Sequence, residues 1–142
     1  MTFKWAEMPD VIVEDAFKIR EEVFVKEQGF NEEFDAKDNE CLHIVGYDGD
    51  MPICCARLFK KSEDTWYVGR IAVKKVHRGT GLGALLMKAV EEKARNLGGK
   101  RLILGAQCRA SGFYEKQGFE KYGEEYLEEC CPHIMMGKAL TF

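Results

Sequence analysis

The stretch VKKVHRGTGLGALLMKAVEEKAR, residues 73–95, places three glycines within five positions directly before a segment with helical periodicity. Glycine costs backbone entropy on folding, so three glycines in one loop indicate a need for exposed backbone. Amides at a helix N-terminus are unpaired and lie at the positive end of the helix dipole, where they bind phosphate. The stretch therefore predicts a phosphate-binding loop, to which Arg78 would add a charge and Thr80 a hydroxyl.

Three kinds of phosphate-binding loop compete for this stretch. A Walker loop ends in GK[ST], which does not occur here. Residues 79–84, GTGLGA, match the dinucleotide form GxGxxG/A. That form also requires an acidic residue at the end of the next strand, and the next expected strand ends in Gly105-Ala106-Gln107. The third form, Q/R-x-x-G-x-G/A, fits residues 78–83 and cradles the pyrophosphate of coenzyme A.

Composition and charge restrict the class of protein. The 142 residues are 46% hydrophobic and 32% charged, which is typical of one soluble globular domain. A net charge of −3 is unlike the basic surface of a nucleic-acid binder. The start, MTFKWAEMPD, lacks the apolar core of a signal peptide, and no apolar run approaches the roughly 18 residues that span a bilayer. We therefore expect a single domain over residues 1–142, located in the cytoplasm, with no nucleic-acid or membrane partner.

The six cysteines show no spacing of a structural zinc site. Four of them form the neighbouring pairs Cys54-Cys55 and Cys130-Cys131. Cys131 and His133 could share a metal ion, but reduced and partly buried thiols are the simpler expectation without a secretion signal. We expect no metal site.

Hydrophobic periodicity predicts a mixture of strands and helices. The helix after the glycine loop should bury Leu82, Leu85 and Leu86 and end at Gly98-Gly99. A strand, a helix and a strand over residues 64–107 require a parallel strand pair joined by a right-handed crossover. We therefore expect an α/β (α+β) fold, a mixed, mostly antiparallel twisted sheet with helices on both faces. The expected strands are 2–7, 41–47, 51–60, 64–73, 101–107, 119–126 and 132–140; the expected helices cover 10–28, 82–97 and 110–117, and 29–40 should be turn-like.

Over nearly its whole length the chain resembles the GNAT superfamily of N-acetyltransferases. The motifs are RGTGLG at 78–83, VGRIAV at 68–73 and AQCRASGFYEKQGFE at 106–120. The last is similar to the family segment N-x-x-A-x-x-F/L-Y-x-x-x-G-F, with Gln107 where many members have asparagine. IREEVFVKEQGFNEEFDAKD at 19–38 and CPHIMMGK at 131–138 resemble the ElaA/YjcF-like branch of this superfamily.

The resemblance implies an acetyl-CoA-dependent N-acetyltransferase that acts on a primary amine. It implies that the strand before the glycine loop holds the pantetheine arm and that the loop amides hold the pyrophosphate. It also implies that Tyr114, a phenol protonated at pH 7, is the general acid for the departing thiolate. The implied residues of the acetyl-CoA site are Ile71, Ala72, Val73, Arg78, Gly79, Thr80, Gly81, Leu82, Gly83, Ala84, Gln107 and Tyr114.

The general base and the acceptor stay open at this point. Candidate bases are Glu27, Glu33, Asp35, His43 and His133, or a water molecule. Residues 27–40 hold six carboxylates against one lysine, so they could attract a cationic amine or form a solvated loop. The acceptor would be a small amine or a peptide amine, and the protein a monomer or homodimer. A non-catalytic acyl-CoA-binding sensor is the alternative function.

Overall fold

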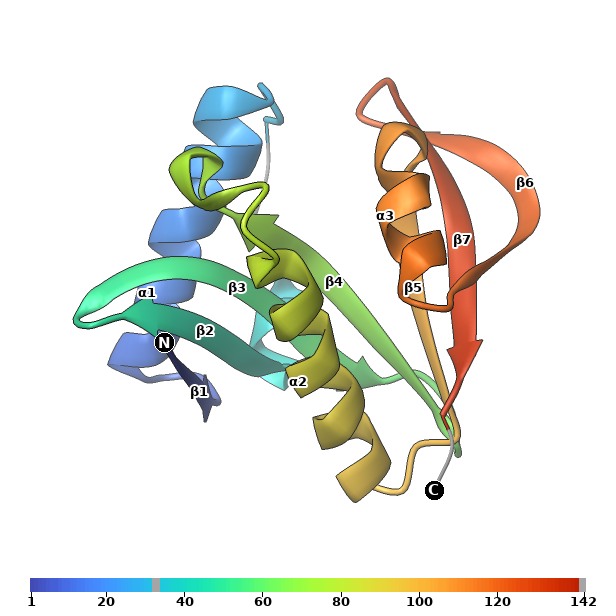
Figure 1. Ribbon diagram of the computed structural model, residues 1–142, viewed down its shortest axis with the longest axis horizontal. Helices are drawn as coiled ribbons and strands as arrows, with labels where there is room; N and C mark the ends of the chain where they lie inside the picture. The colour runs from blue at the N-terminus through green and yellow to red at the C-terminus, as the bar shows by residue number, and fades with distance from the viewer. Residues whose placement is uncertain (32–33, 141–142) are drawn as a thin grey trace.

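The computed structural model describes residues 1–31 and 34–140 and contains one seven-stranded sheet (Figure 1). Its strand order is β1-β2-β3-β4-β5-β7-β6. The strands are β1 Thr2–Ala6, β2 Leu42–Asp48, β3 Met51–Lys60, β4 Thr65–Val73, β5 Arg101–Gln107, β6 Glu120–Glu128 and β7 Cys131–Ala139. The helices are α1 Val11–Arg20, α2 Leu82–Asn96 and α3 Ser111–Lys116, with the π-helix η1 Glu21–Glu27 and the short 3-10 helices η2 Ala36–Glu40, η3 Lys75–His77 and η4 Cys108–Ala110.

The sheet is mixed and mostly antiparallel, which confirms the predicted fold class. Strands β1 to β4 follow one another as antiparallel neighbours, and β4 and β5 form the expected parallel pair. Among the described residues this parallel pairing covers only Thr65–Tyr67 and Arg101–Ile103. Beyond it β4 and β5 diverge, as Figure 1 shows, so their facing backbone edges are left without a strand partner.

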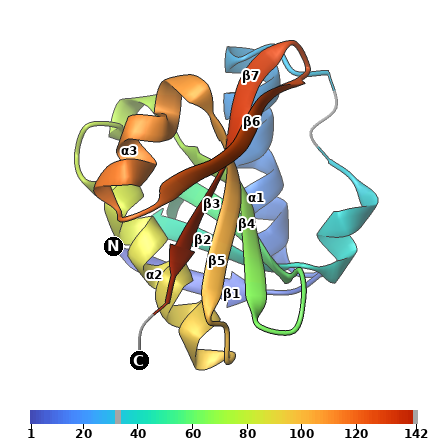
Figure 2. The same ribbon diagram turned by 90° about the vertical axis from the view of Figure 1, so that its right-hand side faces the viewer.

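Helices cover both faces of the sheet (Figure 2). On one face α1 packs against β2 and β3, with Ala16 and Ile19 in the core. On the other face α2 packs against β3 and β4 through Leu86 and Val90. Leu85 was expected to be buried, but its side chain is 52% exposed. The stripe that contains Leu86 and Val90 faces the sheet, and Leu85 lies outside that stripe.

The predicted helix over residues 10–28 is a continuous segment that changes from α to π geometry. Asp10 begins it by accepting a 2.8 Å hydrogen bond from the amide of Ile12. In η1 the turn widens, and the amide of Gln28 bonds to the carbonyl of Val23 at 3.1 Å. This widened end places Glu27 next to the glycine loop, where it bonds to Arg78, and Gln28 next to the end of β5, where it bonds to Gln107.

The turn-like segment after η1 is anchored by a buried ion-pair network. Asp38 accepts hydrogen bonds from Arg20 at 2.7 Å and from Arg57 at 3.0 Å. Arg57 also donates to Asp35 at 2.7 Å. Because Arg20 and Asp38 are both buried, this network fixes the segment against α1 and β3. None of the helices in the described part of the chain is both long enough and apolar enough to span a membrane.

Candidate active site

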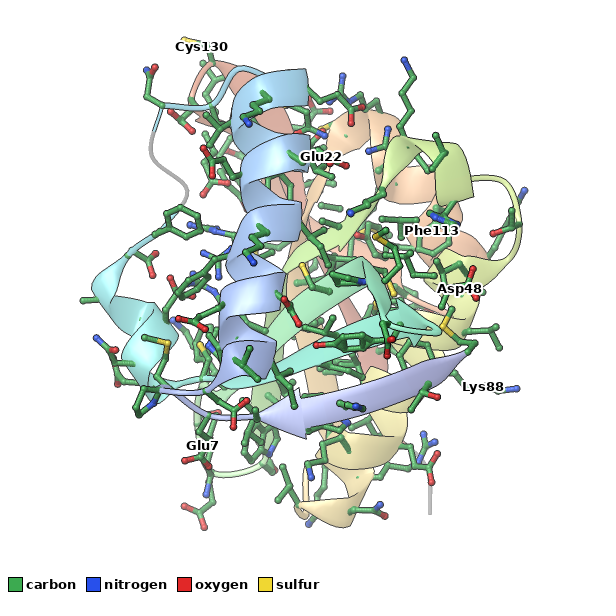
Figure 3. The ribbon with its side chains drawn as sticks, turned by 90° about the vertical axis from the view of Figure 1, so that its left-hand side faces the viewer. Glu7, Glu22, Asp48, Lys88, Phe113 and Cys130 are labelled. Atoms are coloured by element: carbon green, nitrogen blue, oxygen red, sulfur yellow. The ribbon has the colours of Figure 1, made fainter. Side chains whose placement is uncertain are left out.

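A cavity of about 870 Å³ opens where β4 and β5 diverge. The β6–β7 turn and the segment after η1 approach each other at its rim, where the amide of Asn31 donates to Glu129 at 2.9 Å. Figure 3 shows Cys130 at the tip of this turn, beside the end of the long helical segment. The cavity is lined by Phe24, Gln28, Phe30, Asn31, Asp35, Lys37, Arg57, Phe59, Lys61, Tyr67, Val68, Gly69, Arg70, Ile71, Gly105, Gln107, Ala110, Tyr114, Tyr126, Glu128, Glu129 and His133.

The glycine loop has the geometry of an anion-binding cradle. Gly79 and Gly81 adopt left-handed backbone angles, φ 77° and 84°, which a side chain would strain. A Cβ atom at either position would meet nothing within 4 Å, so the backbone is exposed. Gly81 caps α2 without a side-chain hydrogen bond, which leaves the first amides of that helix open to a ligand. Exposed amides at a helix N-terminus are the kind of group that binds an anion such as a phosphate.

The side chains of the loop are engaged with the protein itself. Arg78 donates to both carboxylate oxygens of Glu27, at 2.6 and 2.8 Å, and to the carbonyl of Val73 at 2.9 Å. The hydroxyl of Thr80 donates to the carbonyl of His77 at 2.7 Å. The guanidinium of Arg78 and the hydroxyl of Thr80, which we expected to bind a phosphate, are therefore bonded to other groups of the protein. The amides of residues 79–84 are what the loop presents.

The end of β4 presents its backbone to the gap between the strands. Ala72 and Val73 pair with β3 on one side, and in the described residues β5 pairs with neither. Ile71 lines the cavity, while Ala72 is buried under α1. Arg70 has φ 50°, where the register between β3 and β4 shifts. This bulge bends the strand away from β5 and exposes the edge that a pantetheine arm would need.

Tyr114 reaches the same cavity from α3. Its side chain is 8% exposed, and burial raises the pKa of its phenol to about 12. Within the described part of the chain its hydroxyl has no hydrogen-bond partner, so it is available to a ligand. The ring is held edge-on by Phe113 and Phe119, with ring centroids 5.0 and 6.1 Å away. A protonated, unpartnered phenol in a cavity can donate to a leaving group.

Gln107 connects β5 to the end of η1. Its amide nitrogen donates to Gln28 at 2.9 Å, and its amide oxygen accepts from Arg109 at 2.9 Å. The expected cofactor contact of this side chain would compete with those two bonds. Gln28 was not among the predicted site residues, although it follows Glu27 in the branch motif.

The two candidate histidines lie in different environments. His133 lines the cavity, where its Nδ1 bonds to the carbonyl of Cys131 at 2.8 Å and its Nε2 lies 3.3 Å from Glu128. His43 is 0% exposed and lies outside the cavity lining. Its Nε2 contacts the carbonyl of Asp38 at 2.9 Å, its Nδ1 has no partner among the described residues, and burial lowers its pKa. Only His133 is placed to meet an acceptor.

The candidate carboxylates are held in ion pairs. The hydrogen bond from Arg78 lowers the pKa of Glu27, and the hydrogen bond from Arg57 lowers the pKa of Asp35. A carboxylate with a lowered pKa is a weaker base, which argues against both residues in that role. Glu33, the remaining candidate, lies outside the described residues.

The acidic stretch is largely neutralised by partners elsewhere in the fold. The described carboxylates pair as Glu27 with Arg78, Asp35 with Arg57, Asp38 with Arg20 and Glu40 with Lys37. Glu32 and Glu33 lie outside the described residues. The described carboxylates of residues 27–40 therefore do not form a free acidic surface, which would be needed to attract a cationic amine.

Tyr67, Gly105 and Tyr126, which the sequence motifs did not mark as site residues, also line the cavity. A Cβ atom on Gly105 would lie 2.3 Å from the hydroxyl of Tyr126 and 3.1 Å from that of Tyr67. The two tyrosines are far apart in sequence and meet across β4, β5 and β6. A glycine inside a strand often marks such a close approach, so Gly105 was the available signal.

The six cysteines are free thiols, as expected. All six are unbridged, with Cys41, Cys54 and Cys55 buried. His133 contacts the backbone of Cys131, and the described residues contain no group of three or more side chains suited to a metal ion.

Comparison with known proteins identifies the class to which this fold and site belong. The profile of the acetyltransferase (GNAT) domain matches residues 10–140. The crystal structure of a candidate N-acetyltransferase from Lactobacillus plantarum superposes with a TM-score of 0.91 at 31% identity, over 99% of this chain and 98% of that one. The chain belongs to the GNAT acetyltransferase family and is an acyltransferase, as the sequence predicted.

Two relatives place the chain more narrowly. The uncharacterized N-acetyltransferase YjcF of Bacillus subtilis is 43% identical over 129 residues, which cover 89% of this chain and 91% of YjcF. Protein ElaA of Escherichia coli is 33% identical over 127 residues, covering 85% of this chain and 83% of ElaA. The crystal structure of ElaA has a TM-score of 0.84 at 28% identity, over 96% and 99% of the two chains. The chain is thus a member of the ElaA/YjcF-like branch.

Proposed function

We propose that this acyltransferase transfers an acetyl group from acetyl-CoA to a primary amine by direct attack of the amine on the thioester. The observation that carries the proposal is the divergence of β4 and β5, with Tyr114 and His133 lining the one cavity at that gap. The exposed amides of the glycine loop support coenzyme A as the carrier, because they fit a diphosphate. The sheet draws strands from Thr2 to Ala139, which supports a single domain.

The chemistry requires a base, an oxyanion site and an acid. The neutral amine nitrogen attacks the thioester carbon, so a C–N bond forms and the carbonyl oxygen becomes an oxyanion. We assign the oxyanion to a backbone amide near Val73, at the end of β4, which pairs with β3 but not with β5 among the described residues. Return of the electron pair breaks the C–S bond, and Tyr114 gives its proton to the sulfur.

His133 is the group that we assign to the proton of the amine. It lines the cavity, whereas His43 does not, and the other described candidates, Glu27 and Asp35, are held in ion pairs with arginines. The proton that it takes and the proton that Tyr114 gives are exchanged through solvent, so the products are an amide and a free thiol. Glu27 and Asp35 are assigned structural roles instead.

Thiol release from acetyl-CoA, measured against a panel of amines, tests the proposal. Turnover with an amine is the expected result, and acetyl-CoA binding without turnover of any amine would contradict it and support a sensor. Thermal unfolding with acetyl-CoA or NAD tests the loop assignment separately. Only acetyl-CoA should raise the melting temperature, because a ligand stabilises the fold that binds it.

A further inference from the structure

Aromatic rings form much of the lining of the cavity. Six phenylalanine and tyrosine side chains line it, against Val68, Ile71 and Ala110 as aliphatic residues, among those that the structure describes. Ile71, Gln107 and Tyr114 of the proposed acetyl-CoA site line the same cavity, so the acceptor would share it with the pantetheine arm. The rings therefore indicate what kind of group accompanies the reacting nitrogen.

Five of these rings, together with His133, form three stacked pairs that come from different elements. Phe24 in η1 stacks with Phe30 after it, with centroids 6.2 Å apart and planes inclined by 7°. Figure 1 places η1 on the opposite side of the strand gap from β6 and β7. There Tyr126 stacks with His133, at 5.6 Å and 29°. The third pair, Phe59 and Tyr67 from β3 and β4, lies at 5.1 Å and 20°.

The polar end of this cavity lies next to the assigned base. Tyr126 contributes both a ring face and a hydroxyl over Gly105, and its stacking partner is His133. Glu128 lies 3.3 Å from His133 and is the nearest carboxylate to the ring in the described structure. An amine beside His133 would thus have aromatic faces around its substituent.

Charge does not select a polycationic acceptor. Four basic side chains line the cavity, Lys37, Arg57, Lys61 and Arg70, against the acidic Asp35, Glu128 and Glu129 among the described lining. Arg57 and Arg70 are paired with Asp35, and Lys37 is paired with Glu40. The lining therefore offers a polyamine or a lysine-rich peptide no excess of carboxylates.

From these observations we propose that the acceptor is a monoamine whose nitrogen is carried on a short chain attached to a planar aromatic group. The planar group lies between the Phe24–Phe30 pair and the Tyr126–His133 pair, and the nitrogen meets His133. Ring–ring contacts favour a planar substituent over a saturated one of equal size. This inference rests on the proposed function, since it names the acceptor of the same site.

The test compares 2-phenylethylamine with 2-cyclohexylethylamine, which matches it in chain length and differs in having a saturated ring. Spermidine and a lysine-containing peptide complete the panel. Thiol release from acetyl-CoA gives kcat/KM for each amine, and calorimetric titration in the presence of coenzyme A gives its affinity. We expect the aromatic amine to be preferred over the saturated one by about tenfold in kcat/KM, and spermidine and the peptide to be poorer than both.

Two variants test whether the rings cause the preference. Tyr126→Leu should reduce the preference to about twofold or less, because it removes a ring of the Tyr126–His133 pair, which we place on one side of the planar group. Tyr122→Leu, four residues earlier on the same strand, is the matched control; Tyr122 is 39% exposed and outside the cavity lining, so the preference should persist. Phe30→Leu removes a ring of the Phe24–Phe30 pair on the other side and serves if Tyr126→Leu does not fold.

Each outcome decides the inference separately from the proposed function. Turnover without preference for the aromatic amine, or with preference for spermidine, overturns the inference and leaves the acetyltransferase assignment in place. If no amine is turned over but the aromatic amine still binds more tightly, and loses this advantage in Tyr126→Leu, the inference stands and the proposed function fails. Equal binding of the two ring amines without turnover overturns the inference.

Discussion

Glu27 and Arg78 are joined by two hydrogen bonds of 2.6 and 2.8 Å, across 51 positions of the sequence. This ion pair ties the end of the π-helix to the glycine loop, while the neighbouring Gln28 bonds to Gln107 on β5. One dipeptide therefore contacts segments on both sides of the gap between β4 and β5. We interpret the ion pair as a contact that fixes the position of the glycine loop, which we propose binds the diphosphate of coenzyme A.

Glu27→Gln tests this contact. The change keeps one hydrogen bond to Arg78 and removes the charge, so the loop should become less ordered at a cost of about 1 kcal/mol. We expect KM for acetyl-CoA to rise about fivefold with kcat changed by less than about threefold. Steady-state kinetics at saturating amine measures both. A fall in kcat of about a hundredfold with unchanged KM would instead identify Glu27 as the base.

Tyr114→Phe tests the general acid. Removing the hydroxyl should lower kcat by about 10- to 100-fold, because the sulfur loses its proton donor. Affinity for acetyl-CoA and the melting temperature should change little, since the hydroxyl has no partner in the described structure. Tyr122→Phe is the matched control on the exposed face of β6 and should retain kcat. Wild-type kcat in Tyr114→Phe would remove Tyr114 from the mechanism.

His133→Gln and His43→Gln separate a catalytic role from a structural one. His133→Gln should lower kcat by about 100-fold while acetyl-CoA binding, measured by calorimetry, persists. His43→Gln should keep kcat in the folded fraction and lower the free energy of unfolding by about 1–3 kcal/mol, because it disturbs a fully buried contact to Asp38. Normal kcat in His133→Gln would leave a water molecule as the base.

Gly105→Ala tests the close approach of Gly105 and Tyr126 in the lining of the cavity. The new Cβ atom would overlap the hydroxyl of Tyr126, so the ring, which lines the cavity, must move. We expect kcat/KM for the amine to fall by about tenfold, and removal of that hydroxyl in Gly105→Ala/Tyr126→Phe to restore part of it. Gly112→Ala, where a Cβ would meet nothing within 4 Å, is the control. Unaltered amine kinetics in Gly105→Ala would show that Tyr126 does not shape the acceptor site.

Asp38 predicts how stability depends on pH. Burial opposes its charge, but hydrogen bonds from Arg20 and from the Asp35 amide hold its pKa at about 2, below the ordinary value of 3.8. The ionised carboxylate stabilises the fold when the pH is above the pKa of Asp38 in the unfolded chain. This stabilisation is lost as the pH falls toward the pKa of Asp38 in the folded protein. About 2 kcal/mol of the free energy of unfolding should therefore disappear between pH 4 and pH 2.

Urea titrations at pH 7, pH 4 and pH 2 measure this loss. Asp38→Asn should lose stability already at pH 7, by about 3 kcal/mol, because it removes the charged end of the buried ion pair with Arg20. The free energy of unfolding of this variant should also fall by less between pH 4 and pH 2, because the carboxylate of Asp38 is absent. Glu40→Gln, whose partner Lys37 is exposed, is the control and should titrate like the wild type. An acid profile in Asp38→Asn that matches the wild type would contradict the assignment.

Local signals in the sequence predicted the elements of this fold well. The strands, α2 and its glycine-rich N-terminus were located correctly because periodicity and glycine content depend on neighbouring residues. The parallel β4–β5 pair also followed from element order, since a crossover helix leaves few alternatives. Leu85 was placed wrongly because periodicity defines a stripe without showing which edge of it faces the sheet.

The partners of charged and aromatic side chains were decided only by the tertiary structure. The sequence marked Glu27 as a candidate base, and the fold pairs it with Arg78. The sequence left His43 and His133 equivalent, and the fold buries both but places only His133 in the lining of the cavity. Tyr67, Gly105 and Tyr126 likewise meet only because three strands bring them together. Residue types are local properties, but basicity, charge neutralisation and cavity shape depend on contacts between distant segments, which form when the sheet assembles.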